Sequence, residues 1–121
     1  MNRVRLNLYF KLSEFQCPCC RLVQVEEELV DNLYNLRLAL HRPIIITSGY
    51  RCKKHNVKVG GNPVSAHMRG AAADILVPGI SPSVVEIAAQ KIGFEKVYSN
   101  VKQGFTHCGL ASLGIGEKDN A

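Results

Sequence analysis

The segment from residue 25 to residue 40, VEEELVDNLYNLRLAL, constrains the fold more than any other part of this chain. Its leucines recur at helical spacing, at Leu29, Leu33, Leu36 and Leu40. Three glutamates lie in the first turn, where the helix dipole favours acidic side chains. The pattern predicts an amphipathic helix that ends before Pro43, because proline disfavours helix at the preceding residue. The β-branched run at residues 44–47 then predicts a buried strand.

The rest of the chain combines short strand patterns with one more helix. Three further segments have the pattern of strands: residues 71–77, 94–98 and 105–110. Ser81 and Pro82 supply an N-cap and a first-turn proline for a helix that Gly93 ends, with an expected buried face of Val84, Val85, Ala88 and Ile92. Residues 48–61 are rich in glycine and polar residues and predict a loop with one irregular helical turn. Two main helices and about four short strands favour an α+β fold with a small antiparallel sheet.

Length and composition limit the class of protein. A chain of 121 residues supports one hydrophobic core, so we expect a single domain over residues 1–121. It contains no apolar run of the roughly 18 to 20 residues that span a bilayer, so membrane insertion is not expected. Its first residues, MNRVRLNLYF, have no signal-peptide core, which predicts a protein that is cytoplasmic as synthesised. The net charge of +5 favours polyanionic partners, or alternatively reflects a generally basic surface.

Two of the four histidines have neighbours that suggest metal binding. His67 lies seven residues before Asp74, and His107 lies in the apolar strand GFTHCGL. Two imidazoles and one carboxylate are ligands that hold Zn²⁺ while leaving a fourth position open, which is typical of hydrolytic sites. Spacing alone leaves the alternative of unrelated structural histidines. Cys108 follows a candidate ligand on a strand, so its side chain should face the core.

Several short strings place these residues in a family pattern. They are SGYR at residues 48–51, HN at 55–56, VGG at 59–61, S-x-H-x-x-G-x-A-x-D at 65–74, and the late His107. The pattern resembles the zinc D-Ala-D-Ala carboxypeptidases and phage L-alanyl-D-glutamate endolysins, peptidase family M15. The resemblance extends from about Phe10 to Leu110. It implies a hedgehog/DD-peptidase-like fold and a zinc-dependent peptidase that hydrolyses peptidoglycan stem peptides, at a D-Ala-D-Ala or an L-Ala-D-Glu bond.

The resemblance also implies roles for individual residues. The zinc ligands would be His67, Asp74 and His107. Arg51 would face the substrate as a catalytic and substrate-binding residue, since a guanidinium neutralises charge on a tetrahedral intermediate. The alternative for Arg51 is a structural ion pair that holds the loop. Ser65 is a candidate substrate-binding residue that could instead orient a ligand by a hydrogen bond, or only turn the loop.

The pattern breaks where the general base is expected. Family members carry an acidic residue a few positions before the final histidine, whereas this chain has Gly104 and Asn100 there. Asparagine cannot accept the proton of a water nucleophile. Asn100 could position water while Glu95 or a histidine acts as base, or the loop could differ in length. Alternatively, the protein is a catalytically impaired zinc domain that binds cell-wall peptide or a protein partner. We favour the active or formerly active hydrolase.

Five cysteines in a chain without an export signal should be reduced thiols. Cys17 and Cys20 form a C-x-x-C, and Cys52 and His55 form a C-x-x-H, which together would supply a second, structural zinc site. Such a site would join the N-terminal segment to the SGYR loop. The alternatives are a labile disulfide of Cys17 with Cys19 or Cys20, plain buried thiols, and a His55 that only hydrogen-bonds the loop backbone.

The expected partners follow from the same resemblance. We expect a monomer whose substrate is a peptidoglycan peptide. Nucleic acid is not expected as a partner, because the sequence has no aromatic stacking platform or basic helix. The small size and missing signal fit a phage-type protein that reaches the cell wall through a separate pore, with a bacterial housekeeping origin as the alternative.

Overall fold

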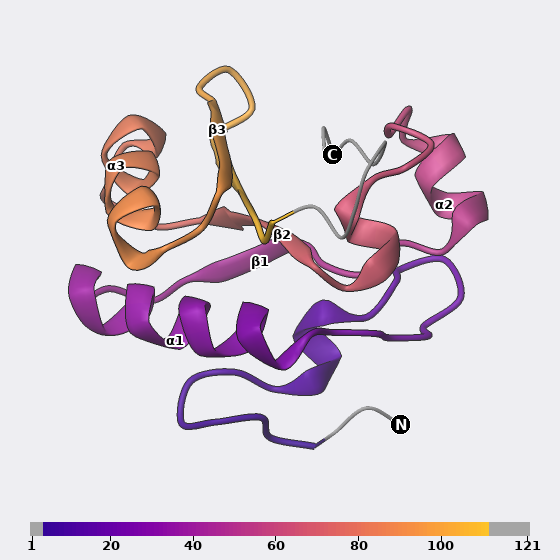
Figure 1. The fold of residues 1–121 in the computed structure, drawn as a ribbon, viewed down its shortest axis with the longest axis horizontal. Coiled ribbons are helices and arrows are strands. Elements are labelled where there is room, and N and C mark those ends of the chain that lie inside the picture. The colour runs from indigo at the N-terminus through magenta and orange to yellow at the C-terminus, as the bar shows by residue number, and fades with distance from the viewer. Residues whose placement is uncertain (1–3, 112–121) are drawn as a thin grey trace.

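The computed structural model describes residues 4–111 and has an α+β fold, as the sequence predicts (Figure 1). The helices are α1 (Glu27–Leu40), α2 (Lys53–Lys58) and α3 (Pro82–Ile92). The strands are β1 (Ile45–Ser48), β2 (Ala72–Leu76), β3 (Lys96–Asn100) and β4 (Phe105–Gly109). Two short 3₁₀ helices are η1 (Leu12–Phe15) and η2 (Ala66–Arg69). No helix among the described residues is long and apolar enough to cross a membrane.

The strands form one antiparallel sheet in the order β1-β2-β4-β3. Strands β3 and β4 form an antiparallel hairpin from two of the segments that have the pattern of strands in the sequence. Helix α3 packs against β3 and β4, and α1 contacts α3 (Figure 1). The core is the layer between these helices and the sheet, and its largest fully buried apolar side chains are Phe10, Phe15, Leu29, Leu33, Leu36, Ile75 and Val85.

The two main helices bury the faces that their periodicity suggests, with one difference. In α1 the buried residues are Leu29, Val30, Leu33 and Leu36, and His41 ends the helix in a left-handed conformation at φ 55°. In α3 the residues buried against the sheet are Val85 and Ala89, whereas Val84 is 52% exposed. The expectation that Val84 is buried was wrong. A pair four residues apart shares one helix face, and Val84 is rotated away from the Val85–Ala89 stripe.

Residues 48–61 contain a regular helix, α2, where we expected a loop with one irregular turn. Cys52 caps this helix, because its Sγ accepts a hydrogen bond from the backbone N–H of His55. Asn56 is buried and donates a side-chain hydrogen bond to the carbonyl of Asn62. The side chain of Asn56 therefore closes the segment that follows the helix.

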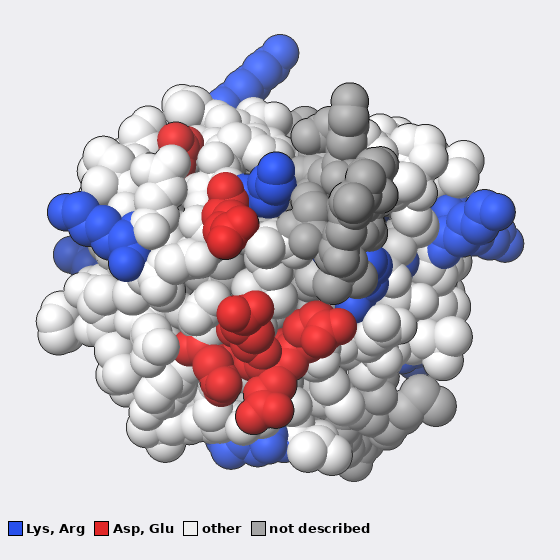
Figure 2. Space-filling model, in the orientation of Figure 1, with Lys and Arg blue, Asp and Glu red and all other residues white. Residues whose placement is uncertain are grey.

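Charged side chains are unevenly distributed over the face shown in Figure 2. Acidic side chains gather over α1, whereas Lys and Arg are spread around the edge (Figure 2). The exposed acidic residues at the start of α1 are Glu26, Glu27, Glu28 and Asp31. On this face the described residues form no continuous basic surface of the kind that binds nucleic acid.

Candidate metal centre and its pocket

The sheet register aligns four polar side chains in one row. Asp74 on β2 lies opposite His107 on β4, and His107 lies opposite Tyr98 on β3. An irregularity in the β1–β2 pairing places Ser48 opposite Asp74. Residues directly opposite one another on neighbouring strands have side chains on the same face of a sheet. The row Ser48, Asp74, His107 and Tyr98 therefore shares a face, while Cys108 is fully buried on the other, as predicted.

His67 reaches this row from η2, and several contacts fix its ring. Its Nδ1 lies 2.8 Å from the carbonyl oxygen of Gly49, to which it can donate a hydrogen bond. Its backbone N–H donates to Ser65 Oγ, at 3.2 Å, and its carbonyl accepts from the backbone N–H of Arg51, at 3.1 Å. An Nδ1–H bonded to a carbonyl leaves Nε2 as the free, unprotonated nitrogen, which is how metal-binding histidines are commonly oriented.

Three side-chain atoms converge on one point of the row. His67 Nε2 lies 3.3 Å from Asp74 Oδ1, and His107 Nδ1 lies 2.9 Å from the same oxygen. One ligand atom from each residue lies within 4.8 Å of the others, and all three residues are buried. Zinc bonds of about 2.0 to 2.1 Å in a tetrahedral site place neighbouring ligand atoms about 3.3 Å apart. The spacing therefore fits a zinc ion.

The unpartnered ring nitrogen of His67 also fits a metal site. His67 Nε2 is buried, and despite its approach to Asp74 it makes no hydrogen bond among the described residues. Buried polar atoms are normally satisfied, so an unpartnered nitrogen aimed at a carboxylate indicates a missing partner. Histidine and aspartate are standard zinc ligands, and a cation between these atoms would satisfy both.

Asp74 is ionised at neutral pH. Burial alone would raise the pKa of its carboxyl, but the hydrogen bond with His107 and the nearby His67 imidazole outweigh burial and hold that pKa well below its ordinary value. The carboxylate also forms an ion pair with Arg51, whose Nη2 lies 3.3 Å from Asp74 Oδ2. A permanent negative charge at this point favours a cation between the two imidazoles.

Arg51 combines the two roles that the sequence left open. Its guanidinium is held by Ser48 Oγ, Asn56 Oδ1 and Asp74 Oδ2, at 3.2, 3.2 and 3.3 Å, so it is part of a structural ion-pair network. It also lines the pocket in front of the metal centre. A guanidinium already fixed in position can receive a substrate oxygen with little loss of side-chain entropy.

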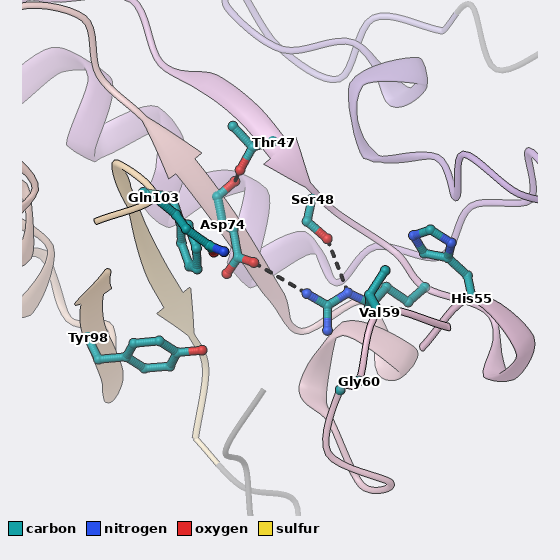
Figure 3. Close-up of a pocket in the computed structure, with 11 residues that line it drawn as sticks. Thr47, Ser48, His55, Val59, Gly60, Asp74, Tyr98 and Gln103 are labelled. Atoms are coloured by element: carbon teal, nitrogen blue, oxygen red, sulfur yellow. Dashed lines mark hydrogen bonds and ion pairs between the residues drawn. The ribbon is translucent and has the colours of Figure 1, made fainter. Parts of the chain in front are cut away.

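A cavity of about 460 Å³ opens onto Asp74 (Figure 3). Its lining residues are Thr47, Ser48, Arg51, His55, Val59, Gly60, Gly61, Asp74, Tyr98, Gln103 and Phe105. The metal centre therefore borders a pocket large enough to admit a peptide segment, with polar groups on several sides.

Tyr98 is the functional candidate that the sequence analysis missed. Its ring stacks on His107, with ring centroids 4.8 Å apart and planes at 16°. Figure 3 shows its hydroxyl pointing into the pocket, below Asp74 in this view. Burial, followed by the negative charge of Asp74, raises the pKa of this phenol, so it is a hydrogen-bond donor at neutral pH. The signal in the sequence was that Tyr98 belongs to an expected strand, residues 94–98, which lies next along the chain to the expected strand that contains His107.

Two other predicted site residues lie outside the pocket lining. Asn100 is in the β3–β4 turn, where its Oδ1 accepts a hydrogen bond from the backbone N–H of Gln103, at 2.9 Å. Ser65 is buried below the pocket and caps η2, so it positions His67 and has no exposed surface for a substrate. The turn conformation explains Gly104, whose φ of 80° is one that glycine adopts without strain.

Of the remaining candidates for a general base, His55 lines the pocket and Glu95 does not. Glu95 is exposed and precedes β3, outside the pocket lining. His55 does line the pocket, and its Nδ1 is buried without a hydrogen-bond partner among the described residues. Asp74 is the only acidic residue in the described lining. No carboxylate in this described lining is free to act as base. His55 is the lining histidine, and Figure 3 shows it beyond Arg51, on the side of the pocket away from Asp74.

The second predicted metal site comes together in part. Cys17, Cys20 and Cys52 form a group whose sulfur atoms lie within 4.8 Å of one another, but His55 is not a member. The expectation of His55 as fourth ligand is corrected by this geometry. Cys52 and His55 are the N-cap and third residue of α2, and the Cys52 thiol binds the His55 backbone N–H while the His55 side chain lines the pocket.

Comparison with known proteins supports the interpretation of the site. A family model described as Peptidase M15 matches residues 8–109. The chain belongs to the peptidase M15 family. No curated protein matches it. M15 peptidases are zinc-dependent, so membership indicates a metallopeptidase that acts on peptidoglycan, and the His-Asp-His group of this M15 chain is one that could hold the metal.

Proposed function

We propose that this protein is a zinc-dependent peptidase that hydrolyses the peptide stems of bacterial peptidoglycan, at a terminal D-Ala-D-Ala bond or an internal L-Ala-D-Glu bond. The observation that carries the proposal is the convergence of His67 Nε2, Asp74 Oδ1 and His107 Nδ1 beside an open pocket. Membership in the M15 family supports the same reaction class. Of the three proposed ligands, Asp74 lines this pocket, together with Tyr98 and Arg51.

The residues of the chain supply binding, charge and proton transfer. His67, Asp74 and His107 would hold the zinc ion, which when bound polarises a peptide carbonyl and acidifies water. Arg51 donates hydrogen bonds to a substrate carboxylate or carbonyl from a guanidinium fixed by Ser48 and Asn56. The Tyr98 hydroxyl donates to the oxygen on which negative charge develops, an interaction that strengthens in the transition state.

His55 is the general base in this proposal. An imidazole can serve as general base. Because Figure 3 shows His55 beyond Arg51 from Asp74, it would act through solvent in the pocket or after a movement of the segment that carries it. His55 lines the same pocket as Asp74 and has a buried Nδ1 without a protein partner among the described residues. Replacing His55 by Gln should lower kcat by about 100-fold with zinc content unchanged, which is the typical contribution of a general base. Unchanged kcat would exclude His55 from this role.

Digestion of purified peptidoglycan tests the reaction itself. The protein is incubated with peptidoglycan with added zinc, and released fragments are weighed by mass spectrometry. We expect new fragments with the wild type, and none after chelation or in an Asp74→Asn variant. The fragment masses identify the bond that is cut. Absence of fragments at full zinc occupancy would refute the peptidase proposal.

A second candidate function is a zinc domain that binds cell-wall peptide without cutting it. It is favoured by one observation, the lack of any acidic residue besides Asp74 in the described pocket lining. Titration calorimetry with a muropeptide distinguishes the two functions. Zinc-dependent heat of binding without cleavage over hours would support the binding domain, and cleavage of the same peptide would exclude it.

A further inference from the structure

A second group of metal-binding side chains lies away from the pocket. Cys17 and Cys20 are in the segment between η1 and α1, and Cys52 is the N-cap of α2. The segments are far apart in sequence, yet the three sulfur atoms lie within 4.8 Å of one another. Cys17 is fully buried, Cys52 is partly buried and Cys20 is exposed. The cluster is therefore closed on one side and open to solvent on the other.

The sulfur spacing fits a metal better than a disulfide. Cys17 Sγ lies 3.7 Å from Cys52 Sγ. Zinc–sulfur bonds of about 2.3 Å in a tetrahedral site place neighbouring sulfurs about 3.8 Å apart. A disulfide has its sulfurs about 2.05 Å apart, and all five cysteines are free thiols in this structure.

The backbone around Cys17 and Cys20 forms a tight turn. The N–H of Arg21 donates to the carbonyl of Cys17, and the N–H of Cys17 donates to the carbonyl of Leu22, both at 2.8 Å. Arg21 is in the left-handed region, at φ 61°, a conformation that is strained for a residue with a side chain. Such strain persists where surrounding structure fixes it, commonly at ligand clamps. The turn returns Cys20 toward Cys17, with the C-x-x-C spacing of zinc ligands.

We propose that Cys17, Cys20 and Cys52 bind a structural Zn²⁺ ion that joins the N-terminal segment to the loop carrying Arg51. Cys19 Sγ lies 3.9 Å from Cys52 Sγ, but Cys19 is not a member of the group whose three sulfurs all lie within 4.8 Å of one another. The three thiolates are therefore the protein ligands, and solvent takes the fourth position. Thiolate ligands are soft and select zinc over magnesium or calcium.

The position of Cys52 gives this ion a structural task. Cys52 directly follows Arg51, and the same loop already touches the N-terminal segment, since the N–H of Tyr50 donates to the carbonyl of Phe15 at 2.7 Å. A Cβ on Gly49 would lie 2.6 Å from Phe15 Cα, so the two backbones are in close contact there. A metal bound to Cys52 would hold this part of the loop in place, including the backbone of the preceding residue, Arg51.

Metal stoichiometry of the full chain tests the proposal. Protein purified under reducing conditions with zinc is analysed by mass spectrometry of its metal content. We expect two zinc ions per wild-type chain, one in Cys52→Ser, one in Asp74→Asn and two in the matched control Cys19→Ser. A wild-type content of one that Cys52→Ser leaves unchanged would overturn the site. Zinc loss in Cys19→Ser equal to that in Cys52→Ser would overturn the three-thiolate assignment.

Cobalt substitution separates this site from the one proposed for catalysis. Co²⁺ bound by thiolates gives a near-ultraviolet charge-transfer band, which a His-Asp-His site lacks. The band should be present in wild type and Asp74→Asn and absent in Cys52→Ser, with Cys20→Ser as a second, surface variant if Cys52→Ser fails to fold. A missing band in Asp74→Asn would overturn the proposal. Because Asp74→Asn lacks the first site, this result is independent of peptidase activity.

Discussion

At the scale of single residues, the contacts of the site converge on Asp74. One carboxylate oxygen faces both imidazoles and the other faces the Arg51 guanidinium. The carboxylate thus balances the positive charge of Arg51 and, in a loaded site, that of the metal. Removing its charge would leave the buried guanidinium with only the neutral oxygens of Ser48 and Asn56.

An Asp74→Asn substitution should remove zinc from the His-Asp-His site. Asparagine keeps the shape but loses the negative charge that attracts the cation. We expect zinc affinity at this site to fall by more than about 100-fold, which exceeds the usual loss when only an outer-shell partner is removed. Competition with a chromophoric chelator measures it. Affinity within a few-fold of wild type would contradict the assignment of Asp74 as a ligand.

A Tyr98→Phe substitution should lower turnover without removing the metal. The phenyl ring retains the stacking on His107, whereas the hydroxyl that would stabilise developing charge is lost. We expect kcat to fall by about 100-fold, the cost of one such donor, with KM nearly unchanged. Steady-state kinetics on a muropeptide, with zinc content measured in parallel, checks this result. A rise in KM at constant kcat would instead indicate simple substrate binding.

The sequence could indicate those site residues that have metal-binding side chains and lie in a recognisable motif, but not those whose place depends on the fold. His67, Asp74 and His107 stand out because histidine and aspartate are metal ligands and form a recognisable string. Tyr98 does not, because its place depends on which strand pairs with β4 and in which register. Asn100 was favoured from its distance along the chain, but the hairpin turn uses its side chain, and Gln103 lines the pocket instead.

At the scale of elements, the short helix η2 positions His67. It ends at Gly70, which has a φ of 70° and lies against Gln24 and Val25 in the segment before α1. A Cβ at Gly70 would lie 2.2 Å from the carbonyl oxygen of Gln24. Gly70 is therefore required by its backbone conformation and by its close contact with this segment.

A Gly70→Ala substitution should destabilise the protein strongly. Left-handed geometry alone costs about 1 kcal/mol for alanine, and the clash with a backbone atom should add about 2 kcal/mol. Gly60→Ala is the matched control, since Gly60 has a φ of 73° and a Cβ added there would meet nothing within 4 Å. Urea unfolding should show a loss of about 3 kcal/mol for Gly70→Ala and about 1 kcal/mol for the control. Equal losses would show that the contact with Gln24 relaxes freely.

The elements themselves were largely predictable, because their local patterns are strong. The leucine period of α1, the Ser-Pro start of α3 and the Gly93 stop all correspond to observed boundaries. Helix α2 was not expected at full length, because KKHNVK has no apolar period and is stabilised by the Cys52 cap and the buried Asn56. The close contact of Gly49 with Phe15 depends on tertiary packing, which no local pattern encodes.

At the scale of the whole molecule, metal binding should stabilise the fold. The ligands of the His-Asp-His site come from η2, β2 and β4, so an ion that binds only the folded state links all three. At zinc concentrations about 100 times the Kd, the stabilisation is about 2.7 kcal/mol. We expect chelation to lower Tm by about 10 °C in calorimetry, with a smaller shift in Asp74→Asn. Equal shifts in both proteins would place the stabilising ion elsewhere.

The row of paired residues from Ser48 to Tyr98 also sets when during folding a metal can be captured. Asp74 and His107 meet only after β4 has docked on β2 in the native register, a contact between segments more than thirty residues apart. A shift of β4 by one residue would turn His107 to the opposite face of the sheet from Asp74. Competence to bind zinc at this centre therefore requires the native pairing of β2 with β4, and its appearance in a refolding experiment would report that this strand pair has formed.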